Sequence, residues 1–494
     1  MILLNIKTKG RAPIFRQVFT QIRDLIDRGT LKPGDRLPSS RLLAGKLGVH
    51  RTTVFKAYQE LWALGYVESR PGSYSVVRER HKVCTLEQRA EKGAVAWDEA
   101  TAPAAKKVLQ LSANMRKHWP EVTPQGLIDL GSLHPDPRLF PVDAFRKQMN
   151  RVLVNHGAEM LSYGPSEGHP PLREYIAQRL RIHGISIAWD EILITNGAQN
   201  GLDLIMKLMA APGCRVFVES PTYALVLPIL AYYDAEVVGI PMEKTGISLR
   251  RLEAEFQKGK PSFLYTMPNF QNPTGITMTQ AHREALLSLC EMHGVPLIED
   301  AFEEEMKYFG KVPLPIKSMD RRQVVVYLGS FSKVLFPGIR IGWIAAEREC
   351  IQRLAALKRF SDLSSASPMQ AALAEFCRQG GYEAHIKRMH RIYRKRMQCA
   401  LDALEAHVKQ KKARWIEPQG GFLIWLSLEG LNQSQGEVYE GLTRKGIRVT
   451  LGNPFFPGKS SRKYLRISIS SLDEKEIVEG IRRLGEGIDR LYRG

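Results

Sequence analysis

Beyond about residue 126 the chain alternates short β-branched runs with helical stretches, and this alternation restricts its fold more than any other feature. The runs are "RVFVES", "SFLYTMP", "VPLIED", "QVVVYLGS" and "IGWIAA". Strands that alternate with helices in this way form a largely parallel sheet wrapped by helices. Ligands of such sheets bind at the carboxyl ends of the strands. We therefore expect an α/β domain whose binding residues follow these runs.

The N-terminal segment has a different pattern. Residues 13–29 carry apolar side chains at helical spacing, and "TLKPGDRLPSS" then breaks the pattern. A short helix is predicted over 41–47 and, after a turn at Gly48, a third helix that ends at Gly65. "YVESRPGSYSVV" indicates two short strands joined by a Pro-Gly turn. Three helices and a hairpin within 80 residues predict a winged helix-turn-helix domain.

The charge of this segment indicates its partner. The whole chain has a net charge of +20, and residues 1–80 hold 15 Lys and Arg against 6 Asp and Glu, a net charge of +9. Nearly half of the excess therefore lies in the first sixth of the chain, which favours a polyanion-binding N-terminus over an ordinary solvated surface.

In a helix-turn-helix protein the second helix of the motif enters the major groove with its N-terminal residues, and flanking basic groups contact phosphate. The residues at that helix start are His50, Arg51, Thr52, Thr53 and Lys56. Arg36 and Arg41 flank it, and Gly72 at the wing tip allows the backbone to approach a phosphate or the minor groove. These residues predict binding to double-stranded DNA; the alternative is a small domain that binds protein.

The rest of the sequence indicates where the domains are joined and which kinds of site and location are not expected. Residues 79–125 are charged and Ala-rich, so we expect a linker, part of it helical, between domains at 1–78 and 126–494. The six cysteines form no Cys-x-x-Cys pair and accompany no His cluster, so no metal site and no disulfide framework are expected. No run of 18 apolar residues and no leader pattern occurs, which predicts a cytoplasmic protein without a membrane partner.

Lys333 lies in "GSFSKVLFPGIRIGW", between a small hydroxylic segment and a Pro-Gly turn. Pyridoxal phosphate needs an amine, a carboxylate for its ring nitrogen, a donor to its phenolic oxygen, a flat group against its ring and a phosphate cradle. Lys333 is the candidate amine, Asp300 the carboxylate, Asn272 the donor and Tyr223 the flat group. Each follows a predicted strand.

The candidate phosphate cradle combines a helix start with two side chains. The backbone amides of Gly197, Ala198 and Gln199 would lie at the positive end of a helix dipole, and Ser330 and Arg340 flank Lys333. Taken singly, such signals have ordinary explanations: a solvated lysine, an aspartate that caps a helix, an Asn-Pro-Thr-Gly turn. Their order and their common place at strand ends favour a cofactor site.

Residues 11–78, and above all "GDRLPSSRLLAGKLGVHRTTVFKAYQELWALGYVESRPGS", resemble the DNA-binding domain of the GntR family of bacterial transcription regulators. The family commonly has Ser or Thr where His50 stands and Gly where Tyr74 follows the wing turn. These departures are compatible with DNA binding but affect which operator sequence is expected.

Residues 126–490 resemble the fold-type-I aminotransferases in "YGPSEGHPPLREYI", "NGAQNGL", "PNFQNPTG", "SFSKVLFPGIRIGW" and "YLRISIS". Together with the GntR-type segment, they make the whole chain resemble the MocR subfamily of regulators. The resemblance implies a multidomain homodimer: a winged helix-turn-helix joined to an α/β fold-type-I aminotransferase-like domain that binds pyridoxal phosphate.

The same resemblance implies a role for each site residue. Lys333 would form the Schiff base, Asp300 would pair with the ring nitrogen, Asn272 would bind the phenolic oxygen, and Ser330 and Arg340 would hold the phosphate. Arg466 falls where aminotransferases bind the α-carboxylate of an amino acid, and Tyr163 would reach the phosphate in the partner subunit.

Two positions depart from the pattern of the relatives. Phe302 replaces a tyrosine that hydrogen-bonds the phenolic oxygen, so Asn272 would make that contact alone. Leu225 stands where some relatives have a second anion-binding arginine, which makes an effector with two acidic ends less expected.

Three functional hypotheses follow. The first is a transcription regulator that senses an amino compound, or pyridoxal phosphate itself, through the aldimine at Lys333 and so changes its operator binding. The second is a working aminotransferase with an accessory DNA-binding domain, in which a released Lys333 acts as general base. The third is a cofactor-free interaction scaffold. A well-formed DNA-binding domain on every copy favours the first.

Overall fold

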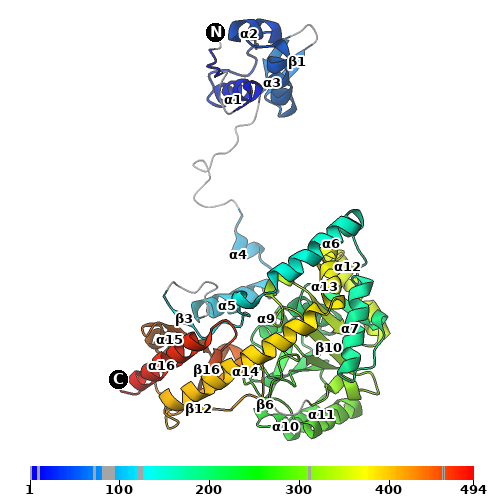
Figure 1. Ribbon diagram of the computed structural model, residues 1–494, viewed down its shortest axis with the longest axis vertical. Coiled ribbons are helices and arrows are strands. Elements are labelled where there is room, and N and C mark those ends of the chain that lie inside the picture. Colours follow the sequence, from blue (N-terminus) through cyan, green and yellow to red (C-terminus); the bar gives the residue numbers. More distant parts are fainter. Residues whose placement is uncertain are drawn as a thin grey trace. The chain divides into compact units, whose positions relative to one another are not determined.

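The computed structural model describes residues 3–7, 12–70, 74–79, 95–118, 126–309, 313–458, 460 and 462–493. The chain divides into two compact units, Met1–Ala100 and Thr101–Gly494 (Figure 1). The segment 79–125 is divided between them, because helix α5 (Pro103–His118) belongs to the second unit. Within the described ranges, none of the helices combines the length and the apolar character that crossing a membrane requires.

The first unit is the expected winged helix-turn-helix. Its elements are α1 (Ile14–Asp27), α2 (Ser40–Leu47), α3 (Arg51–Ala63) and an antiparallel pair, β1 (Val67–Arg70) and β2 (Tyr74–Val77), followed by a short helix, α4 (Trp97–Ala100). Ser39 caps α2 by accepting a hydrogen bond from the Leu42 amide at 3.2 Å, and Gly48 ends it with φ +63°. This cap and this turn fix where α3 begins.

A small core holds the first unit together. Its fully buried side chains come from all three long helices and from the hairpin, and include Val18, Ile22, Leu43, Val54, Leu61, Val67 and Val77. Every member of this core lies before residue 78, so the unit has its own hydrophobic centre.

The second unit is built on an eight-stranded sheet in the order β4-β11-β10-β9-β8-β5-β6-β7. The strands are β4 (Ile192–Thr195), β5 (Arg215–Ser220), β6 (Glu236–Glu243), β7 (Gly246–Ile247), β8 (Phe263–Thr266), β9 (Leu297–Asp300), β10 (Val325–Ser330) and β11 (Gly342–Ala345). All pairings are parallel except those made by β11 and β7. The predicted parallel α/β sheet is confirmed, and its parallel strands end at one edge.

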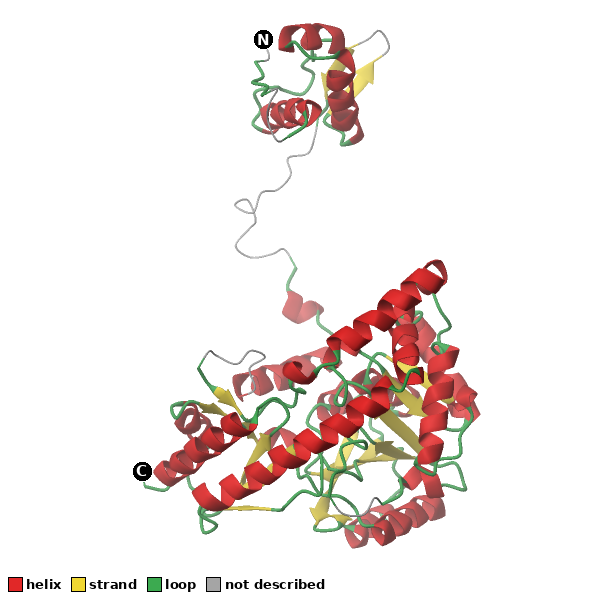
Figure 2. Ribbon diagram, viewed as in Figure 1, coloured by secondary structure: helices red, strands yellow, loops and turns green. Residues whose placement is uncertain are grey.

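Alternate residues of these strands enter cores on opposite faces of the sheet. In β5, Val216 and Val218 pack in one core and Phe217 packs in another. The first core contains α8 (Ala198–Met209), α9 (Val226–Tyr232) and α12 (Arg348–Asp362). The second contains α10 (Leu249–Phe256) and α11 (Gln280–His293). The sheet is therefore a buried layer between helices (Figure 2).

A further core joins the sheet to the long helices and to a smaller C-terminal sheet, of order β12-β13-β16-β15. Its helices are α6 (Val142–Met160), α7 (Pro170–Ile182), α13 (Ser367–Arg378), α14 (Gly381–His407), α15 (Gln435–Thr443) and α16 (Glu474–Leu491). The strands are β12 (Ala413–Trp415), β13 (Leu423–Leu428), β15 (Thr450–Leu451) and β16 (Lys463–Ser468), and β3 (Ile128–Asp129) pairs in parallel with β14 (Ile447–Arg448).

Candidate functional site

A pocket of about 740 Å³ lies at the carboxyl edge of the large sheet. The sequence predicted most of its polar side chains as site residues: Lys333, Asp300, Asn272, Tyr223, Gln199, Ser330, Arg340 and Arg466 all line it, as does Ala198. Most of them follow strands of the large sheet, so its parallel topology brings together residues that lie far apart in the sequence, whereas Arg466 comes from β16 of the smaller sheet.

Lys333 supplies the amine of this pocket. Its Nζ donates a hydrogen bond to the carbonyl oxygen of Leu133 at 2.8 Å. Burial lowers the pKa of Lys333 to about 8; Glu303 opposes this shift, while Arg466 and Arg340 lower the pKa further. An amine that loses its proton near neutral pH is a competent nucleophile.

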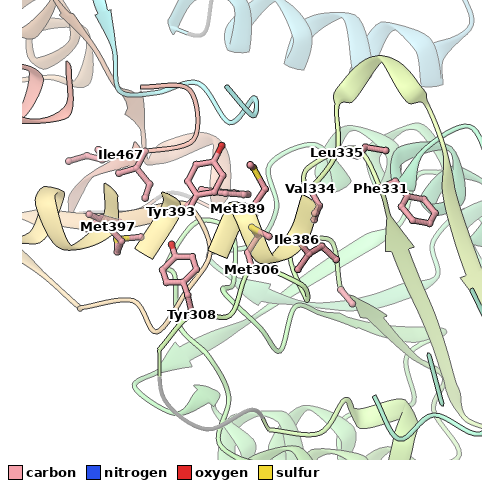
Figure 3. Close-up of a cluster of buried hydrophobic side chains, with 14 of the residues drawn as sticks. Met306, Tyr308, Phe331, Val334, Leu335, Ile386, Met389, Tyr393, Met397 and Ile467 are labelled. Carbon is pink, nitrogen blue, oxygen red and sulfur yellow. The ribbon is translucent and has the colours of Figure 1, made fainter. Parts of the chain in front are cut away.

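The loop that carries Lys333 is held in place by buried neighbouring side chains. Phe331, Val334 and Leu335 flank the lysine and are buried in the core that contains Ile386 and Met389 of α14 (Figure 3). The Ser332 amide also donates to Ser330 Oγ at 3.1 Å. A side chain held on such a loop presents its amine in a fixed direction.

Asp300 is the buried carboxylate at the end of β9. Its Oδ2 accepts a hydrogen bond from the Tyr265 hydroxyl at 2.6 Å, whereas no described residue donates one to its Oδ1. Burial raises the pKa of Asp300 to about 6. A buried carboxylate oxygen without a donor is costly, and a protonated ring nitrogen would satisfy it.

The start of α8 and Arg340 form a compact cradle. Gly197 precedes the helix with φ +87°, and Arg340 donates to the Asn196 carbonyl oxygen at 2.9 Å. A Cβ at Gly197 would lie 2.6 Å from a terminal nitrogen of Arg340, so only glycine allows this approach. Free amides at a helix start beside a guanidinium form a binding site for a phosphate.

Arg466 and Asn272 form the remaining polar wall. Arg466 donates to Asn272 Oδ1 and to the Gly131 carbonyl oxygen, both at 3.0 Å. Because the Asn272 oxygen faces Arg466, its NH₂ group is the part able to donate to a ligand. Burial lowers the pKa of Arg466 to about 10, so the guanidinium remains charged at neutral pH.

Several lining or supporting residues were not predicted. Tyr265 supports Asp300, the loop 132–134 lies beside Lys333, and Glu303 is a fully buried carboxyl group that interacts electrostatically with Lys333. Burial raises the pKa of Glu303 to about 8. Helix α5 also contributes to the wall. The sequence of the charged segment 79–125 did not indicate that a helix from it would line the pocket.

Three further residues singled out in the sequence, Tyr163, Phe302 and Leu225, differ in whether they line this pocket. Tyr163 is 84% exposed and does not line the pocket of its own chain. Phe302 and Leu225, the two departures from the relatives, do line it.

The predicted DNA-contacting side chains gather around the start of α3. His50 caps the helix, its ring lying 2.7 Å from Thr52 Oγ1, and Arg51 is exposed, with Nε donating to Ser40 Oγ at 3.5 Å. Thr53 and Lys56 follow in the first turns of α3, and Lys56 lies 4.4 Å from the ring of Phe15.

The other candidates for DNA contact are two arginines and the wing glycine. Arg36 stacks on Tyr74 at 4.3 Å, Arg41 lies in α2, and Gly72 falls outside the described residues.

Comparison with known proteins identifies both parts. Residues 126–484 match the family model "Aminotransferase class I and II", and residues 15–77 match "Bacterial regulatory proteins, gntR family". An uncharacterised HTH-type transcriptional regulator of Bacillus subtilis, YdfD, is 31% identical over 98% of both chains. The probable rhizopine catabolism regulatory protein MocR of Rhizobium meliloti is 27% identical over 98% of this chain and 95% of its own. The chain belongs to the MocR-type regulators.

A MocR-type regulator is a DNA-binding transcription regulator with an aminotransferase-like domain, and both parts are present here. The second part resembles the crystal structure of LysN, an α-aminoadipate aminotransferase of Thermus thermophilus complexed with N-(5′-phosphopyridoxyl)-L-leucine. The TM-score is 0.75 at 30% identity, covering 81% of this chain and all of LysN.

Proposed function

We propose that this MocR-type regulator binds pyridoxal phosphate at Lys333 and senses an amino compound there, and that this chemistry changes how it binds its operator in the cytoplasm. The observation that carries the proposal is the buried Asp300 Oδ1, which lacks a donor within the described chain, in a residue that lines the same pocket as Lys333. LysN, whose structure contains a phosphopyridoxyl amino acid, supports it by analogy.

The residues present fit this cofactor. Lys333 would attach the aldehyde, Asp300 would hold the ring nitrogen, and Asn272 would donate to the phenolic oxygen. The start of α8, with Ser330 and Arg340, would hold the phosphate, and Tyr223 would lie against the ring. The bound cofactor supplies an electrophilic carbon and an electron sink for an amino compound.

The chain's own groups then define the effector site. Arg466 would bind a carboxylate, and the low pKa of Lys333 allows its amine to give up or take a proton near neutral pH. Displacement of Lys333 by the effector's amine would free Nζ to donate to the Leu133 carbonyl, as it does in the structure described here, which provides a local change between two states.

We further propose a homodimer in which Tyr163 contacts the partner's phosphate site, since Tyr163 is exposed and cannot serve its own pocket. Catalytic transamination is the second candidate function, because Lys333 would be suited to proton transfer once displaced.

The test is titration of the purified full chain with pyridoxal phosphate, followed by visible absorption and by retention of the cofactor on dialysis. Wild type should bind and become yellow, and Lys333→Ala should lose the band while keeping its fold. Lys244→Ala, an exposed lysine in the β6–β7 turn, is the matched control and should bind as wild type does.

Operator affinity measured with and without a panel of amines then separates the two candidates. A change in affinity in wild type but not in Lys333→Ala supports sensing. Turnover of the amine with a keto acid, without any change in DNA affinity or footprint, would replace the sensor with an enzyme. A wild-type protein that takes up no pyridoxal phosphate would refute both.

A further inference from the structure

Helix α5 is the first long helix of the second unit, and it packs on that unit along one face. Its half-buried residues Ala104, Ala105, Val108, Ser112 and Met115 recur at helical spacing, whereas Lys106, Leu109, Gln110 and Asn114 are exposed. Met115 packs against the small core formed by Ala224, Trp425 and Phe455, and Lys107 forms an ion pair with Asp234, two residues after the end of α9.

The buried face of α5 also forms part of the Lys333 pocket. Val108, Ser112, Met115 and Arg116 line this pocket together with the cofactor residues. One helix therefore contacts both the body of the second unit and the space that a bound effector would fill.

The wall that includes α5 is mainly apolar. Val108 and Met115 share it with Leu202, Leu225 and Pro228. Among the side chains of α5 that the structure describes, Arg116 is the one charged group that lines the pocket, and it is exposed, so water and salt screen it. If the amine of an effector is at Lys333 and its carboxylate at Arg466, its side chain remains to fill this apolar part of the pocket.

The position of α5 in the sequence adds a second role. The first unit ends at Ala100 and α5 begins at Pro103. A group that displaces or holds α5 therefore acts on the helix to which the DNA-binding unit is tethered. Differential contact with such an element is what an effector needs in order to shift an equilibrium between two states.

We infer that α5 is the specificity element of the effector site: it selects amino acids with large apolar side chains and transmits their binding to the tether of the DNA-binding unit. This inference rests on the proposed cofactor function. It adds the chemical class of the effector and the helix that responds to it.

The experiment uses the full chain loaded with pyridoxal phosphate. L-alanine, L-leucine, L-phenylalanine and L-glutamate are titrated while the cofactor spectrum is followed, and operator affinity is measured with and without each compound. Wild type should bind leucine or phenylalanine more tightly than alanine, by roughly ten-fold to a hundred-fold for a well-buried side chain, and more tightly than glutamate.

Val108→Ala and Met115→Ala remove apolar surface from the pocket side of α5, and Gln110→Ala on its exposed face is the matched control. Both pocket variants should keep the visible band, lose most of the preference for leucine and phenylalanine over alanine, and show a smaller change in operator affinity. Gln110→Ala should behave as wild type. The retained band reports that a variant is folded.

The outcomes separate the inference from the proposal beneath it. Absence of a visible band in wild type would refute the cofactor function and the inference with it. A normal band with an unchanged order of amino-acid affinities in Val108→Ala and Met115→Ala would refute only the role of α5. Tighter binding of glutamate than of leucine would refute the apolar effector class.

Discussion

Gly197 shows how much a single residue decides at this site. It takes φ +87° directly before α8, and the Arg340 guanidinium occupies the space that a side chain would need. The positive φ and the close approach of Arg340 each favour glycine at this position. Together, the start of α8 and Arg340 form the cradle. The phosphate affinity that we propose for the pocket would therefore depend on a residue that contributes no side chain.

We predict that Gly197→Ala weakens pyridoxal phosphate binding, because its Cβ would move Arg340 and strain the start of α8. A loss of about ten-fold or more in affinity is expected from one displaced charged hydrogen-bonding group. Spectral titration measures it.

Gly213→Ala is the control, since Gly213 also has a positive φ of +76° but has no atom within 4 Å of a Cβ. Equal effects of the two substitutions would mean that backbone strain, and not the Arg340 contact, is responsible.

Among the elements, strands were easier to predict than supporting contacts. The β-branched runs marked the strands whose ends carry Asp300 and Lys333, because a buried parallel strand needs a continuous apolar run. Tyr265 was missed because its contact with Asp300 depends on β8 lying beside β9, which the order of runs in the sequence does not state.

The place of α5 was missed for a different reason. Its packed face is made mostly of small or polar residues, Ala104, Ala105 and Ser112, so the segment has few large apolar side chains to show periodicity. A helix of this kind can be expected from composition, but the surface that receives it becomes known only from the tertiary structure.

Helix α3 is the element on which operator binding should depend. We predict that Arg51→Ala weakens binding by roughly 1–3 kcal/mol if Arg51 contacts a base, with the cofactor spectrum unchanged. Gln59→Ala, an exposed position further along α3, is the control. Measurement at several salt concentrations distinguishes a base contact from a phosphate contact, which would lower the salt dependence as well. Unchanged affinity at every salt concentration would place recognition elsewhere.

At the scale of the whole molecule, the exposed Tyr163 leads to a prediction about assembly. If each pocket borrows Tyr163 from its partner, Tyr163→Ala and Lys333→Ala homodimers should both bind pyridoxal phosphate poorly. Mixed dimers of the two variants should regain one complete site, because one chain supplies Lys333 and the other supplies Tyr163.

The measurement is cofactor affinity after the two variants have been unfolded and refolded together, compared with each refolded alone. A mixture that binds no better than the sum of its parts would show that Tyr163 does not act in the partner's site. Two DNA-binding units on such a dimer would address two half-sites about 34 Å apart, or a multiple of that distance.

The order of strands also sets the order in which the molecule is completed during synthesis. β3 can pair only after β14 has been synthesised, and β4 can pair with β11 only after β11 has been synthesised, much later in the chain. The core of the winged helix-turn-helix is complete once residue 77 has left the ribosome. Because domains fold as units while the chain emerges N-terminus first, the DNA-binding unit is finished long before the aminotransferase-like unit. A message cut short within the second unit would therefore yield a folded DNA-binding unit without a complete pocket.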